Sequence, residues 1–175
     1  KVGDAELGRA HHVYFGWTAA PEMQPLAADL FHRALPVCET FECPFAWSHA
    51  LIGIHAYLRR YSGDTDARRI REVLGHRLYD LFENNATEDW PWPEDKLTYA
   101  NAKLPHALLM CGQWIPHPAM TDAGLESLVW LTDLQHTDAD EGHFIPIGSD
   151  GFYQQGGERA RFDQQPVEAQ TMVSA

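Results

Sequence analysis

The chain has 175 residues, with 13 basic and 25 acidic side chains and a formal net charge of −12. This acidic balance excludes sequence-independent binding to nucleic acid, which needs a basic surface, and it argues against binding to anionic membranes. No apolar run approaches the ~20 residues that cross a bilayer. A hydrophobic share of 45% excludes a disordered chain, and the length fits one domain over residues 1–175.

The apolar residues recur at helical spacing along most of the chain, which predicts an all-α fold. The predicted helical stretches are residues 4–17, 23–34, 47–61, 70–82 and 121–129. The segment Asp64-Thr65-Asp66 precedes the fourth stretch and is suited to cap it, because side-chain oxygens of such residues accept hydrogen bonds from the first free N–H groups of a helix. No β-hairpin pattern is convincing, although residues 144–153 fit a short pair of strands at most.

Long loops alternate with short turns in this pattern. Residues 84–98 and 136–162 are long connections rich in Trp, Pro, Gly and carboxylates, and such loops in compact domains are usually functional. Three helical segments follow long connections, starting near residues 43, 97 and 162, at a spacing of roughly 55–60 residues. This spacing predicts helical hairpins packed around an axis, with the long loops and the starts of the inner helices at one end.

The densest chemical cluster spans Glu88 to Asn101 and combines four carboxylates with two Trp, one Tyr and one Asn. Hydrolysis of a glycoside needs two carboxyl groups, one of which an apolar setting keeps protonated. Trp90 and Trp92 fit that setting, which makes Glu94 or Asp95 the candidate general acid. The alternative is an acidic loop whose carboxylates only stabilise the N-terminus of the next helix.

The second cluster spans Phe162 to Glu168, and its Asp163 is the candidate general base or nucleophile. Capping of the next helix explains Asp163 as well, but it does not explain Gln164 and Gln165. If the inner helices converge, Asp163 faces the first cluster. A separation of about 5–5.5 Å between the carboxyl groups would indicate a retaining enzyme, and about 6.5–9.5 Å an inverting one.

The loop from Asp138 to Tyr153 is a further candidate. It does not fit a calcium-binding loop, since His143 and Ser149 stand where the EF-hand register needs Gly and Glu. A loop over the site that offers His143 or Tyr153 to substrate, a looser metal site with His136 and His143, and a plain surface loop remain the three interpretations.

Other motifs are absent, and the sequence predicts no cofactor and no bound metal. It contains no phosphate-binding loop, no nucleophile elbow and no HExxH motif. His49, His55 and His106 fit structural roles on helix faces. Three cysteines cannot form a closed disulfide framework, so we expect buried thiols in the cytoplasm, with a Cys38–Cys43 disulfide as the alternative.

Residues 90–105 and 162–169 resemble a bacterial group of (α/α)6-toroid proteins. This group is similar to six-hairpin glycosidases and is often encoded with glycosyltransferases. The resemblance covers most of residues 40–175, and it implies a carbohydrate in an axial cleft, with Glu94, Asp95 and Asp163 as candidate acids and bases. Relatives of this kind include hydrolases, phosphorylases and epimerases.

A complete toroid has twelve helices, whereas this chain supplies about six or seven. We therefore expect a partial toroid that is a fragment of a longer ring, and self-association if the ring is open, because an open ring exposes apolar faces.

The sequence thus predicts a carbohydrate-active enzyme, most simply a glycoside hydrolase that acts on an oligosaccharide or glycan with paired carboxylates. The residues expected to contact the substrate, by stacking on sugar faces or by bonding hydroxyls, are Trp90, Trp92, Tyr99, Asn101, His143, Tyr153, Gln164 and Gln165. The alternative is a noncatalytic sugar-binding or scaffold domain associated with a glycosyltransferase. A helical protein-interaction repeat is a third interpretation.

Overall fold

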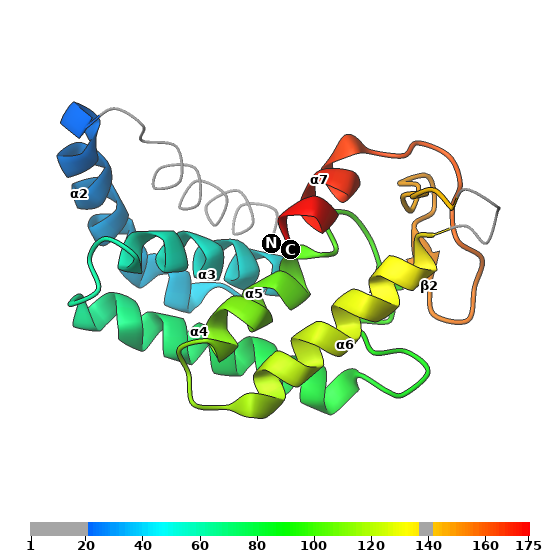
Figure 1. Ribbon diagram of the computed structural model, residues 1–175, viewed down its shortest axis with the longest axis horizontal. Coiled ribbons are helices and arrows are strands. Elements are labelled where there is room, and N and C mark those ends of the chain that lie inside the picture. Colours follow the sequence, from blue (N-terminus) through cyan, green and yellow to red (C-terminus); the bar gives the residue numbers. More distant parts are fainter. Residues whose placement is uncertain (1–20, 137–141) are drawn as a thin grey trace.

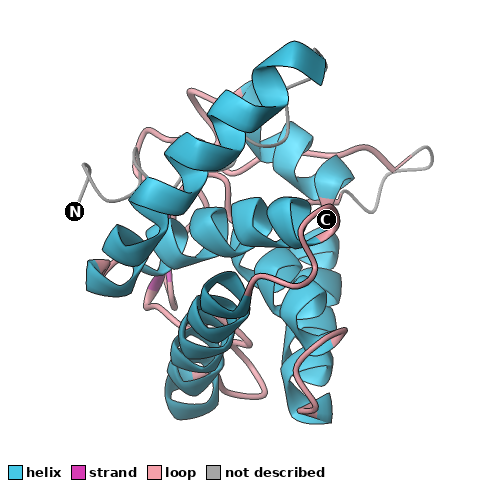
Figure 2. Ribbon diagram, turned by 90° about the vertical axis from the view of Figure 1, so that its left-hand side faces the viewer, coloured by secondary structure: helices cyan, strands magenta, loops and turns pink. Residues whose placement is uncertain are grey.

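The computed structural model describes residues 21–136 and 142–175, and within them it is mostly helical (Figures 1 and 2). The α-helices are α2 (Gln24–Ala34), α3 (Pro44–Leu58), α4 (Thr65–Asn85), α5 (Lys103–Gly112), α6 (Pro118–Leu134) and α7 (Pro166–Ser174). Two 3-10 helices, Pro21–Met23 and Leu35–Thr40, flank α2. The helix predicted over residues 4–17 and the acidic residues 138–141 lie outside the described residues.

Helices α3 and α5 form the centre of the fold. Helix α3 packs against α4 and α5, and α5 packs in turn against α6 and α7. Ten of the 15 residues of α3 are buried, which explains why its sequence is apolar on nearly every side. Helices α3 and α4 are thus neighbours in sequence and in space, and so are α5 and α6 (Figure 1). The described residues form a mostly helical small domain, and they show no toroid.

Helix α4 follows the predicted pattern closely. Its N-cap is Asp64, whose Oδ1 accepts a hydrogen bond from the backbone N–H of Ala67 at 2.9 Å. Its buried residues recur at intervals of three and four, which presents one apolar face to the core: Ala67, Ile70, Leu74, Gly75, Leu78, Tyr79 and Phe82. The predicted capping start is therefore confirmed, and so are Ile70, Leu74, Leu78 and Phe82 of the predicted stripe, whereas Val73 and Leu81 are only half-buried.

The stripe predicted at the start of α6 is confirmed at Leu128, which packs against the core, but it is wrong at its two other positions. Leu125 and Val129 are about half exposed, whereas the small residues Gly124 and Ser127 face inward. A Cβ atom on Gly124 would stand 3.1 Å from the backbone oxygen of Pro105 in α5. The close approach of α5 and α6 thus selects small residues at the contact, and apolar periodicity alone does not reveal such a contact.

The strand pairing also differs from the expectation. Strand β1 (Lys96–Leu97) pairs antiparallel with β2 (Tyr153–Gln154), so the partner of β2 is distant in sequence and not within residues 144–153. Lys96 stands opposite Gln154, and Leu97 opposite Tyr153. This small sheet joins the two long loops that the sequence marks as candidate sites.

The cysteines are thiols, with Cys38 and Cys111 buried as predicted and no disulfide between Cys38 and Cys43. Burial raises the pKa of both buried thiols to about 12, which keeps them protonated and unreactive at neutral pH. Among the described helices, none has both the length and the apolar character that a membrane crossing requires.

Candidate functional site

The loops before α5 and α7 form one assembly, which we call the loop platform and define as residues 94–101 and 147–165. The β1–β2 pair ties its two halves together, and the backbone N–H of Gln155 extends the pairing by donating to the carbonyl of Asp95 at 2.8 Å. The platform lies at the right-hand side of Figure 1, beyond the N-terminal end of α5. The two clusters that the sequence singled out are therefore parts of one structure.

A second set of contacts holds the end of the platform that leads into α7. The backbone N–H of Ser149 donates to the carbonyl of Asp163 at 3.0 Å. Gly148 fits beneath Phe162 so closely that a Cβ atom there would stand 2.0 Å from the carbonyl oxygen of Phe162. Only glycine permits this approach, and it places Asp163 where the chain turns toward α7.

The backbone of the platform is strained. Ala100, Phe152 and Asp163 have φ values of 55°, 60° and 56°, and they are the non-glycine residues with positive φ in the described part of the chain. Asp tolerates this left-handed region, whereas Ala and Phe pay about 1–2 kcal/mol for it. Such strain persists only where the surrounding structure over-determines it, and it concentrates at functional sites.

The three candidate catalytic carboxylates differ in exposure. Asp95 and Asp163 are exposed, while Glu94 is half-buried. The carboxylate of Asp163 accepts hydrogen bonds from the hydroxyl of Ser149 and, at 2.8 Å, from the side-chain amide of Gln165. These bonds fix its direction without enclosing it. The β1–β2 pair and the Ser149 contact place Asp95 and Asp163 on the same platform.

Four predicted substrate-contacting residues are accessible. Tyr99 is 44% exposed, and its ring stacks on Phe45 at the start of α3 with 6.1 Å between the ring centroids. Gln164 and Gln165 are exposed at the start of α7, and His143 is exposed before the platform begins. The accessible aromatic ring and the two amides lie at the N-terminal ends of α3, α5 and α7.

Trp90, Trp92 and Tyr153 have a different environment from the one expected of sugar-stacking residues. Trp90 is 5% exposed and Trp92 only 1%. The Trp90 ring makes edge-to-face contacts with Trp130 and Tyr153 at centroid distances of 5.0 and 5.3 Å, and its indole N–H donates to the carbonyl of Glu94 at 2.8 Å. Burial of Trp90 and Trp92 leaves neither indole face open to a ligand. Tyr153 is only half-buried.

Asn101 is also buried, and it binds Glu168 of α7. The Glu168 carboxylate accepts hydrogen bonds from the Asn101 side chain at 2.9 Å and from the Asn101 backbone N–H at 3.3 Å. The side-chain amide of Gln135 approaches the same carboxylate at 3.5 Å. Burial raises the pKa of Glu168 above its ordinary value, even though these hydrogen bonds favour the charged form.

Sequence reasoning did not assign a role to Glu168 or Gln135. A carboxylate in the first turn of a helix is usually explained by its favourable interaction with the helix dipole. The sequence position of Glu168 in α7 therefore does not show that it has a buried partner. Gln135 lies at the end of α6 and carries no motif. Only the fold reveals that the three residues meet.

The donor set for a metal is sparse. Among residues 21–136 and 142–175, no group of three or more His, Cys, Asp or Glu side chains is arranged to hold a metal ion. His136 instead approaches the backbone carbonyl of Thr132 through Nδ1 at 3.2 Å.

No protein-family model, curated protein or solved structure matches this chain.

Proposed function

We propose that this chain has a carbohydrate-active enzyme function and binds an oligosaccharide on the loop platform. The observation that carries the proposal is the strained backbone at Ala100, Phe152 and Asp163, in the same loops that hold the exposed candidate carboxylates. Backbone strain lowers the stability of a fold, so its concentration in one set of loops needs another explanation. The positioning of reactive groups is such an explanation. The packing of α3 on α4 and of α5 on α6 is compatible with the helical hairpins of such an enzyme.

The chemistry available on the platform suits a sugar. An exposed aromatic ring, Tyr99, offers a flat apolar face, and Gln164 and Gln165 offer amides that exchange hydrogen bonds with hydroxyl groups. Asp163 acts in the proposal as general base or nucleophile, with Asp95 or Glu94 as general acid. Trp90, Trp92 and Asn101 stabilise the platform and do not contact the substrate, because they are buried.

A noncatalytic sugar-binding role is the second candidate, and the environment of Asp163 favours it. Two side-chain hydrogen bonds, from Ser149 and Gln165, already occupy its carboxylate. Such bonds also suit a residue that only fixes a loop for binding. The two candidates differ in turnover and not in the location of the sugar.

Turnover and binding are therefore measured together on a panel of neutral gluco-, manno-, galacto- and xylo-oligosaccharides. For an enzyme, Asp163→Asn lowers the release of reducing ends by at least ~100-fold while the Kd changes by less than about twofold. Asp80→Asn removes an exposed carboxylate from α4 and is the matched control, with no effect expected. Binding without turnover by the unmodified protein supports the second candidate. Neither binding nor turnover contradicts both.

A further inference from the structure

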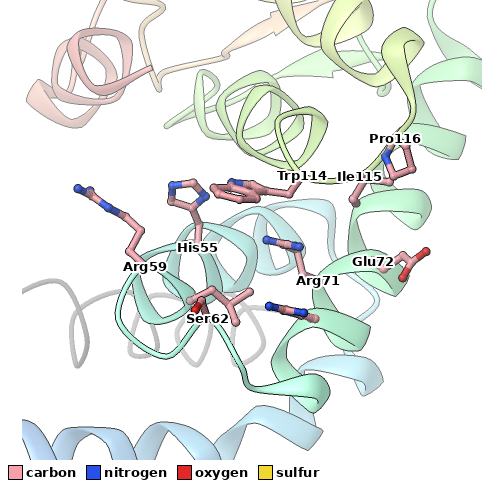
Figure 3. Close-up of a pocket in the computed structure, with 10 residues that line it drawn as sticks. His55, Arg59, Ser62, Arg71, Glu72, Trp114, Ile115 and Pro116 are labelled. Atoms are coloured by element: carbon pink, nitrogen blue, oxygen red, sulfur yellow. The ribbon is translucent and has the colours of Figure 1, made fainter.

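Figure 3 shows a pocket of about 670 Å³. Because its lining includes the C-terminal end of α3 and the loop after α5, it lies at the other end of these two helices from the loop platform. The C-terminal end of α3, the first half of α4 and the loop after α5 line it. The residues that matter for its chemistry are His55, Arg59, Arg68, Arg71, Glu72 and Trp114. We call this the Arg71 pocket. Its volume is within the usual range for small-molecule sites, and its position separates it from the proposed sugar site.

The pocket carries an excess of positive charge. Among the described residues that line it, three guanidinium groups stand against one carboxylate, Glu72. In the described part of the chain, none of these three arginines forms an ion pair with a carboxylate. Arg69, which lies between two of them on α4, points elsewhere and binds both oxygens of Glu39, at 2.7 and 2.9 Å. Within the described residues, Arg69 is therefore neutralised by an ion pair, whereas the three pocket arginines are not.

Arg71 is the least solvated of the three. Its Nε is buried and has no hydrogen-bond partner among the described residues. A buried donor without a partner costs free energy, which a bound acceptor would recover. The pKa of His55 is lowered, first by burial and then by the charges of Arg59 and Arg71, so these positive charges act on one small volume. An acceptor with more than one negative charge fits that volume best.

The pocket also has a flat apolar wall. Trp114 is 60% exposed, and the guanidinium carbon of Arg71 lies 5.7 Å from the centroid of its ring. Figure 3 shows the Trp114 ring beside His55, with Arg71 extending into the same space from α4. An exposed indole that borders a group of arginines offers stacking next to charge recognition.

We propose that the Arg71 pocket binds a phosphate monoester whose organic part contains a flat ring, such as a nucleoside monophosphate. Guanidinium forks match the oxygens of a phosphate, and the two charges of the monoester offset the excess of two positive charges in the pocket. The ring packs on Trp114. Binding of this ligand does not depend on the proposed sugar site, since the two sites are at opposite ends of α3 and α5.

Isothermal titration of the full chain tests the proposal with AMP, adenosine, ribose 5-phosphate and inorganic phosphate as probes. We expect AMP to bind at least tenfold more tightly than any of the other three, and to bind more weakly as salt is added. Arg59→Gln and Arg71→Gln should each weaken AMP at least tenfold. Trp114→Ala should weaken AMP but leave ribose 5-phosphate unchanged.

Arg60→Gln is the matched control, because Arg60 carries the same charge next to Arg59 but does not line the pocket. Arg59 is exposed, so its variant keeps the test valid even if Arg71→Gln fails to fold. No AMP binding at millimolar concentration overturns the proposal. So does adenosine binding as tightly as AMP, or an equal loss of AMP binding in Arg60→Gln. If inorganic phosphate binds as tightly as AMP, the pocket holds an adventitious anion only.

Discussion

Oε1 of Glu168 accepts a hydrogen bond from Nδ2 of Asn101 at 2.9 Å, and this contact joins the start of α7 to the residues just before α5. Glu168 is 1% exposed and Asn101 is fully buried. Asn101 is the last residue of the 94–101 half of the loop platform, and Glu168 lies three residues beyond the end of the 147–165 half. The pair therefore fixes the relative position of the two loops that carry the candidate carboxylates.

Removal of this carboxylate should destabilise the fold. Glu168→Ala removes the buried acceptor of the Asn101 backbone N–H, of the Gln135 amide and of one side-chain N–H of Asn101, whose Nδ2 keeps only its bond to the carbonyl of Thr98. We expect the free energy of unfolding to fall by about 3 kcal/mol. Urea unfolding measures this loss. Glu158→Ala removes an exposed carboxylate and should change stability by less than about 0.5 kcal/mol. Equal effects of the two variants would mean that the buried network contributes nothing.

Glu168 should also make the free energy of unfolding depend on pH. Because burial raises the pKa of Glu168 above about 4.5, the folded protein binds more protons than the unfolded chain above that pH. Its contribution to stability is fully present at lower pH and is lost as the pH rises through the folded-state value. Glu168→Gln removes this contribution, so the difference in unfolding free energy between the two proteins should vary with pH across that window. A constant difference would contradict the raised pKa.

Trp92 should matter for stability and not directly for ligand binding. Trp92→Ala removes a fully buried ring that contacts Phe82 and Trp130, and a cost of about 3–5 kcal/mol is expected. Trp92→Phe should cost less, since it keeps an aromatic ring and removes an indole N–H that has no partner among the described residues. Trp114→Ala, at an exposed position, should cost less than about 1 kcal/mol. Thermal unfolding followed by circular dichroism ranks the three variants.

Gly148 should be the most sensitive glycine of the loop platform. Gly148→Ala forces the backbone away from Phe162, because three backbone atoms of Phe162 lie within 3.0 Å of the added Cβ. We expect a loss of about 1–3 kcal/mol and faster proteolysis within residues 147–165. Gly63→Ala is the control, since nothing lies within 4 Å of its added Cβ. Equal cleavage rates would show that the platform does not depend on this contact.

Asp64 should give the opposite dependence on pH from Glu168. Burial opposes ionisation of Asp64, but the hydrogen bonds from Ala67 and Tyr57 outweigh it and lower the pKa below about 3.8. Its contribution to stability is therefore present above pH 3.8 and is lost as the pH falls through the lower value. Asp64→Asn keeps an N-cap side chain but cannot titrate, so its stability should fall less in acid. Parallel acid unfolding curves would contradict the lowered pKa.

Local sequence pattern predicts the elements whose structure depends on local forces. Asp64 and the buried stripe of α4 lie where the helix period and capping chemistry place them. Helices α3 and α7 begin at Pro44 and Pro166, because proline fits the first turn of a helix. These features need only a few neighbouring residues, so a single sequence contains them.

The contacts that build the sites are not local, and the sequence does not reveal them. Trp90 and Trp92 have the composition of a sugar-binding loop, yet their burial depends on Trp130, which belongs to α6. The Glu168–Asn101 pair joins residues far apart in the chain. The Arg71 pocket combines side chains from three separate segments, each of which reads as an ordinary charged surface by itself.

The most direct test of the central claim is a titration of the isotope-labelled chain with the neutral oligosaccharide panel, followed by amide chemical-shift mapping. We predict that the amides of Tyr99, Asp163 and Gln165 shift with one of these sugars, and that Tyr99→Ala weakens the binding about tenfold. The amides of Arg71 and Trp114, at the far end of α3 and α5, should not move. If no oligosaccharide shifts the loop platform, or if the shifts occur only around Trp114, the platform is not a carbohydrate site.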